Sequence, residues 1–172
     1  MKRVDGWIRL MRLLFIVAGI MMNAVVAAAE SVKHVVLTAD LSGNQEVPPV
    51  ITSAAGKAVF QLSEDDRTLH YELTTSNIKD ITEVHIHMGP TGQNGVVVVV
   101  LFDISDNAKG SVEGNVLRGD ITADALIGPL VGSPLTALLR EMEEGHTYIN
   151  VHSMEYPVGH IRGQIIDPSR KE

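Results

Sequence analysis

Apolar and polar residues alternate along several short segments of the chain. Segment 68–74 is the clearest example, since Leu69, Tyr71 and Leu73 share one face and the residues between them are polar or charged. A period of two is typical of a β-strand with one buried face. Segments of this kind, or rich in β-branched residues, predict strands at 35–41, 57–62, 68–74, 83–88, 95–102, 115–121, 147–152 and 161–166.

Two segments depart from this alternation. Residues 95–102 form an unbroken apolar run, mostly valine, which predicts a strand buried on both faces. Residues 133–144 have apolar side chains at helical spacing, with Ser133 as the predicted cap, Pro134 at the first helical position and Gly145 as the stop. A further short helical turn is predicted within 120–126.

The order of these elements predicts the fold class. Many short strands separated by turn residues, with one short helical connection, indicate an all-β domain, either a β-sandwich or a Greek-key barrel. No repeat or low-complexity linker interrupts the pattern. We therefore predict one domain over residues 32–167.

The first 29 residues have the pattern of a secretory signal peptide. Basic residues fall within 1–12, an apolar run fills 13–26, and Ala27 and Ala29 stand at the positions that a signal peptidase recognises. The apolar run would rise only about 21 Å as a helix, too little for a bilayer core of roughly 30 Å. The sequence therefore predicts a leader at 1–29 and a secreted or periplasmic mature protein with no membrane contact after cleavage.

We expect the exported protein to begin near Glu30, because Ala27 and Ala29 are the small residues that precede it. Intact-mass spectrometry of the exported protein should give the mass of the chain from about that residue onward. A mass that still includes residues 1–29 would contradict the predicted leader.

The amino-acid composition excludes several classes of function. The chain has 172 residues and no cysteine, which excludes disulfide scaffolds, thiolate zinc sites, cysteine nucleophiles and lipid attachment through cysteine. The formal net charge is −7, and removal of residues 1–29 leaves 10 basic against 20 acidic residues, or −10. Nucleic acid is not a predicted partner, because binding its phosphates on this balance would need a strong basic patch and the sequence has none.

Histidine is the residue type whose placement suggests chemistry. His85 and His87 lie two apart in a predicted strand, so both imidazoles lie on one face. The same alternation predicts that His152 and His160 also point outward from their strands. If these strands are neighbours, His85, His87, His152 and His160 would form a site for zinc or copper. Arg162, predicted on the same face, disfavours a cation and suits an anion or a partner carboxylate.

A simpler interpretation stands beside the metal site. Outward-facing histidines on strands often serve only as hydrated or hydrogen-bonding groups, and the sequence does not give the strand order. His70 is predicted to be exposed and without function, and His146 is predicted to cap the end of the helix. The chain has no nucleophile elbow, P-loop or dinucleotide fingerprint, so no catalytic residue is predicted.

Four segments together resemble the chordin-type domain called CHRD. They are 41–50 (LSGNQEVPPV), 84–95 (VHIHMGPTGQNG), 148–152 (YINVH) and 159–164 (GHIRGQ). They follow the family's order, and the resemblance covers about residues 35–166. It implies an all-β, immunoglobulin-like domain of secreted proteins with no established catalytic role. His160 departs from the family, which usually has an acidic residue there.

A looser similarity is to copper/zinc superoxide dismutase, a β-sandwich with a His-x-His copper pair like His85 and His87. The chain lacks that family's cysteines and has no counterpart of the family's bridging histidine. Two function classes follow. The first, which we favour from the sequence, is a non-catalytic extracytoplasmic module that binds an unknown protein or small ligand. The second is a copper or zinc protein, for storage, transfer or, least favoured, dismutase-like redox chemistry.

Overall fold

The computed structural model describes residues 35–105, 111–113 and 115–170, so the predicted leader lies outside the described residues. The strands are β1 (Val36–Ser42), β2 (Ala55–Leu62), β3 (Leu69–Ser76), β4 (Ile81–Met88), β5 (Val96–Asp103), β6 (Ser111–Glu113), β7 (Val116–Ile121), β8 (Thr147–Ser153) and β9 (Ile161–Gln164). One helix, α2 (Leu135–Glu143), and three 3₁₀ turns at Gly43–Gln45, Ala123–Ala125 and Gly128–Leu130 complete the described elements. All eight predicted strands are present, and β6 is the strand that the sequence did not predict.

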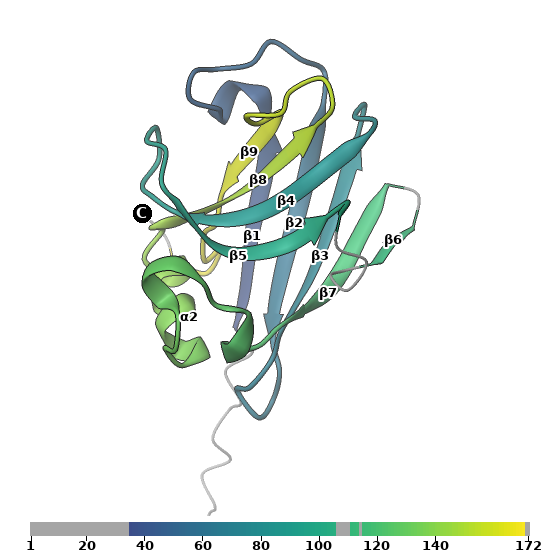
Figure 1. The fold of residues 1–172 in the computed structure, drawn as a ribbon. Helices are drawn as coiled ribbons and strands as arrows, with labels where there is room; N and C mark the ends of the chain where they lie inside the picture. Colours follow the sequence, from purple (N-terminus) through teal and green to yellow (C-terminus); the bar gives the residue numbers. More distant parts are fainter. Residues whose placement is uncertain (1–34, 106–110, 114, 171–172) are drawn as a thin grey trace, which may run out of the picture. The chain divides into compact units, whose positions relative to one another are not determined.

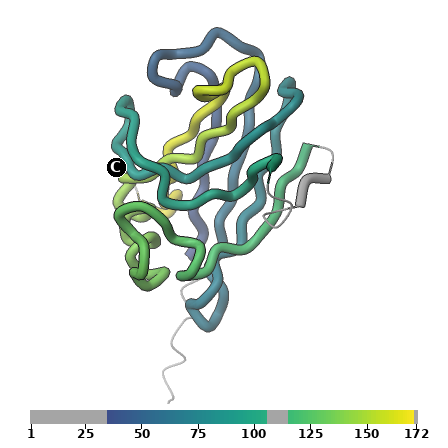
Figure 2. The backbone as a smooth tube through the Cα atoms, viewed as in Figure 1, coloured from purple at the N-terminus to yellow at the C-terminus, as the bar shows by residue number. Residues whose placement is uncertain are grey.

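The strands form one antiparallel sheet in the order β5-β4-β8-β9-β1-β2-β3-β7-β6. The sheet curls so strongly that β4 and β5 cross over β2 and β3 in the view of Figure 1, and the backbone trace in Figure 2 follows the same curl. The Tyr71 hydroxyl of β3 donates a hydrogen bond of 2.8 Å to the Leu101 carbonyl of the edge strand β5, which joins these two strands across the core. The structure therefore confirms an all-β fold with one helix. Its nearly barrel-like single sheet does not confirm the predicted immunoglobulin-like Greek-key sandwich.

The core fills the inside of the curled sheet. On β4 and β8 the alternate residues Val84, Ile86, Ile149 and Val151 are buried against it, as their parity predicts. Helix α2 adds a second apolar stripe, with Leu135, Leu138, Leu139 and Met142 buried. The helix begins at Leu135, and its N-terminal cap is Pro134, whose backbone is still extended, in place of the predicted cap Ser133.

Strand β5 differs from its prediction. It lies at the edge of the sheet, so its Val96 side chain is more than half exposed and the strand is not buried on both faces. Two register shifts in its pairing with β4 allow the adjacent residues Val98 and Val99 both to be buried. These bulges explain why its apolar run shows no alternation.

The opposite face of β8 and β9 is also covered. Asn150, His152 and Arg162 point away from the core as predicted, but they are 8% exposed or less and do not face solvent. His160, just before β9, is also buried, at 4% exposed. Both strands lie inside the sheet, and loops fold over their outer face. Arg162 donates hydrogen bonds to the Pro90 carbonyl and the Asn94 amide oxygen on one such loop. The outward prediction was therefore right about the face and wrong about its exposure.

Candidate metal centre

Three of the four predicted histidines converge on the outer face of β4 and β8. The ring centroids of His85 and His87 lie 5.7 Å apart, and those of His85 and His152 lie 5.2 Å apart. One ring nitrogen from each of His85, His87 and His152 can be chosen so that all three lie within 4.8 Å of one another. A single ion could therefore contact all three imidazoles.

Strand parity and register bring these side chains together. Val84 and Ile86 are buried in the core, which turns His85 and His87 to the other face of β4. In the antiparallel pairing with β8, Glu83 lies opposite His152 and His87 lies opposite Tyr148. The three imidazoles thus come from two adjacent strands, a rigid part of the sheet that needs no loop to order it.

Hydrogen bonds fix the tautomers of His87 and His152. The Nδ1 atom of His87 lies 3.0 Å from the Gly95 carbonyl oxygen, and Nδ1 of His152 lies 3.1 Å from that of Pro157. A carbonyl only accepts, so Nδ1 carries a proton in both rings, and in the neutral form of each ring Nε2 has the lone pair. Both Nε2 atoms are buried and have no hydrogen-bond partner among the described residues. Metal-ligating histidines typically donate their other ring N–H to a carbonyl in this way.

His85 lies at the rim of the cluster. Its side chain is 12% exposed, and its Nε2 atom is 3.9 Å from a carboxylate oxygen of Glu83. The Glu83 side chain is 44% exposed, so its charge is partly hydrated. Metal access from solvent would therefore run past Glu83, the most exposed of these groups, since His85 and His87 are partly buried and His152 is buried.

An aromatic stack supports the inner side of the cluster. His87 stacks on Tyr148 with ring centroids 4.8 Å apart and planes 8° apart. The Arg162 guanidinium carbon lies 3.4 Å from the centroid of the same tyrosine ring. Burial lowers the pKa of His87, and the charges of His152 and Arg162 lower it further, against the opposing effect of the hydrogen bond to Gly95. His87 is therefore held neutral, the form that binds a metal.

His160 lies apart from this group. Its Nε2 atom is 3.0 Å from the Thr52 hydroxyl, and its Nδ1 atom is 2.9 Å from the Ser153 hydroxyl. Its ring also packs on Tyr156 with centroids 4.3 Å apart. The structure thus places His160 as a connection between the loop before β2 and the end of β8.

Glu46 is the residue near the cluster that the sequence did not predict. It lies on the loop after β1, is buried, and accepts a hydrogen bond of 3.3 Å from the Asn150 side-chain amide. Burial raises the pKa of Glu46 to about 7, although the charge of Arg162 and the bond from Asn150 oppose the rise. A glutamate in the turn-rich segment 41–50 gives no hydrophobic periodicity that could predict its burial.

The raised pKa of Glu46 predicts a pH-dependent stability. The folded protein binds this proton more tightly than the unfolded chain, whose glutamate has a pKa near 4.5. The free energy of unfolding should therefore fall as pH rises from about 4.5 through about 7, by roughly 3 kcal/mol at most. Urea denaturation should show that Glu46→Gln removes this fall. A fall of equal size in the variant would contradict the assignment.

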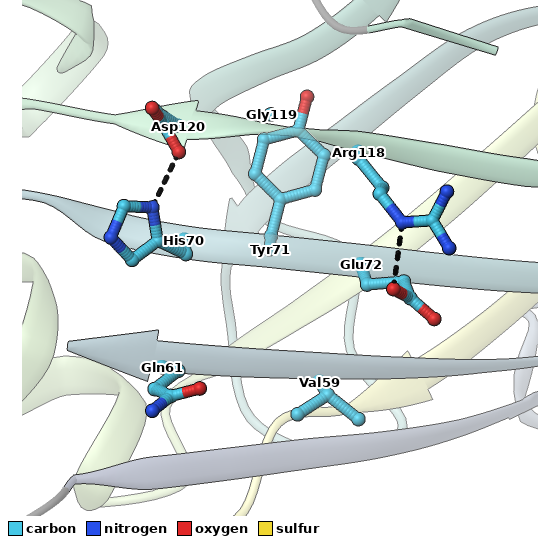
Figure 3. A pocket seen from close by; sticks show the side chains of 8 residues that line it. All are labelled: Val59, Gln61, His70, Tyr71, Glu72, Arg118, Gly119 and Asp120. Carbon is cyan, nitrogen blue, oxygen red and sulfur yellow. Dashed lines mark hydrogen bonds and ion pairs between the residues drawn. The ribbon is translucent and has the colours of Figure 1, made fainter. Parts of the chain in front are cut away.

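Two other polar regions give weaker support for a functional site. An open hollow of about 580 Å³ lies over β2, β3 and β7. Figure 3 shows the side chains that line it. Its polar groups pair with one another, His70 with Asp120 at 2.6 Å and Arg118 with Glu72 at 2.8 Å. Near the end of α2, Glu141, Glu144 and His146 also come within metal-binding distance, but the latter two are exposed and the cluster forms its own ion pairs. His146 thus pairs with carboxylates, while its backbone N–H bonds to the Glu141 carbonyl.

Residues 37–165 match the family described as the CHRD domain. The chain belongs to the CHRD domain family. No curated protein and no solved structure matches it.

The segments whose sequences resemble the CHRD domain meet on the covered outer face of the sheet. Gln164 donates to the carbonyls of Gly89 and Gly145, and its backbone N–H donates to the Gln45 side chain. Asn94 donates to the Val47 carbonyl. These bonds hold the loops of a small domain of extracellular type around the histidine cluster. Among the described residues, no helix is both long and apolar enough to cross a membrane.

Proposed function

We propose that this CHRD domain is an exported metal-binding protein that holds copper(II) or zinc(II) with His85, His87 and His152. The observation that carries the proposal is the pair of buried Nε2 atoms on His87 and His152, which have no hydrogen-bond partner among the described residues and are free to ligate a metal in the neutral form of each ring. A buried polar atom without a partner costs free energy, and a bound ion would remove that cost at both atoms.

The type of ligand limits which metal ions the site can hold. Imidazole suits zinc and copper, whereas calcium and magnesium prefer oxygen ligands. Copper(II) is expected to bind more tightly than zinc(II), because nitrogen sites generally follow that order. The exported compartment follows from the predicted leader, and membership of the CHRD family supports an extracellular-type domain.

The position of Arg162 weakens one objection to a metal site, which is the positive charge of this side chain. Its guanidinium lies over the Tyr148 ring and donates to Pro90 and Asn94, so it does not point into the gap between the three histidines. Buried Glu46 lies close enough to act on it electrostatically. The repulsion between Arg162 and a metal ion is therefore reduced both by the intervening ring and by this neighbouring carboxyl.

A separate observation supports a second candidate function. Ile51 and Val158 are 97% and 88% exposed, on two loops that the Thr52–His160 contact joins. Exposed apolar side chains on two joined loops suit a contact with a protein partner. A non-catalytic interaction module therefore remains the second candidate function, and it is compatible with a bound metal.

Elemental analysis of the exported protein tests the proposal. The protein should be purified without a histidine tag and without chelator, beside a His87→Ala/His152→Ala variant expressed in the same way. We expect about one copper or zinc per chain in the wild type and almost none in the variant. Equal metal content in the two proteins, or none in either, would contradict a site at these histidines.

A further inference from the structure

We infer that the metal at His85, His87 and His152 keeps one coordination position open, and that this position binds a small inorganic anion. This inference rests on the proposed function, since it concerns the same site with its metal in place. The anion would replace a bound water, which leaves as the new metal–anion bond forms.

The number of protein ligands points to an open position. The cluster brings together three ligand atoms, each from an imidazole. Zinc sites with four protein ligands are typically structural, whereas three protein ligands leave the fourth position to water or substrate. Glu83 is the carboxylate found beside the cluster, but its oxygen lies 3.9 Å from His85 Nε2 and is not grouped with the other two rings.

The charges around the site favour an anion over a neutral ligand. A divalent ion held by three neutral imidazoles keeps its full charge of two. Arg162 adds a further positive charge against Tyr148, the same ring on which His87 stacks. The nearby carboxylates are Glu83, which is partly hydrated, and Glu46, which is buried and only partly ionised near neutral pH. The loaded site therefore has excess positive charge.

The covering of the site limits the size of the ligand. His152 is 8% exposed and the His85 side chain 12% exposed, so the approach to the metal is narrow. Tyr148 and the loop that carries Gly95 close the inner side, because the Tyr148 hydroxyl accepts a hydrogen bond from the Gly95 N–H. We therefore expect an anion of a few atoms, such as azide or bicarbonate, to reach the metal and a bulky carboxylate to be excluded.

Azide titration of the copper(II)-loaded protein tests this inference. Azide bound to copper(II) gives a charge-transfer absorption band, so its binding can be followed directly, with bicarbonate as a competitor. Two variants accompany the wild type. Glu83→Gln removes the negative charge at the rim of the site, and Glu72→Gln removes one from an exposed position on β3 that pairs with Arg118.

We expect saturable azide binding in the wild type, displacement by bicarbonate, about threefold tighter binding in Glu83→Gln and no change in Glu72→Gln. A wild-type protein that holds copper but gives no azide band would overturn the inference. Copper affinity that falls about tenfold or more in Glu83→Gln would also overturn it, because Glu83 would then be the fourth ligand. A wild type that takes up no copper would instead refute the proposed function, and the inference would fall with it.

Discussion

The His87→Ala/His152→Ala variant should bind copper(II) and zinc(II) at least about a hundredfold more weakly than the wild-type protein. The substitutions remove two of three ligands, and changes even to groups that only orient a ligand typically cost about 10–100-fold in metal affinity. Calorimetric titration at neutral pH measures the difference. The variant should remain folded, because both rings lie on the outer face of the sheet and not in the apolar core.

A matched control removes two histidines elsewhere. His70 and His146 are about half exposed and pair with Asp120 and with Glu141 and Glu144. The His70→Ala/His146→Ala variant should keep the wild-type affinity, and His160→Ala should keep it within about threefold because His160 lies outside the cluster. Loss of binding in the control variant, with normal binding in His87→Ala/His152→Ala, would place the site at the end of α2 instead.

Val151→Asp should lower the free energy of unfolding by about 3 kcal/mol or more, or prevent folding altogether. Val151 is completely buried on the core side of β8, so the aspartate would lose its hydration without gaining a partner. Val131→Asp makes the same change at an exposed position and should cost no more than about 0.5 kcal/mol. Urea denaturation or thermal melting compares the two variants.

The comparison tests the strand parity on which the histidine cluster depends. If Val151 faces the core, then His152 must face the other side of β8. If the Val151→Asp variant melts at nearly the same temperature as the Val131→Asp variant, that result would contradict this parity. It would also remove the reason for placing His152 beside His85 and His87.

Local patterns were enough to predict the strands, because each strand has a buried face and a polar or covered face. The alternation of Leu69, Tyr71 and Leu73 predicted β3, and all three side chains are buried. Strand β6 has three residues, too few to show a period, and was missed. The sheet as a whole could not be predicted, because its curl and its strand order depend on contacts between distant segments such as Tyr71 and Leu101.

The candidate site was predictable only in part, for a related reason. Parity places His85, His87 and His152 on the outer face correctly, but it says nothing about what covers that face. Loops bring Glu46 and Asn94 over the sheet from positions far away in sequence. His160 shares the predicted parity, yet it precedes the first residue of β9, and its ring bonds to Thr52 and Ser153. Its contacts with a loop, and not its parity, decide its role.

X-ray absorption spectroscopy of the metal-loaded protein tests the central claim most directly, because it identifies the atoms bound to the metal. We expect the extended fine structure of the zinc-loaded protein to show three imidazole nitrogens at about 2.0–2.1 Å and one further light-atom ligand. In the His87→Ala/His152→Ala variant, the imidazole contribution should be lost. A wild-type spectrum with oxygen ligands alone, or with the same imidazole contribution in the variant, would contradict a metal site at His85, His87 and His152.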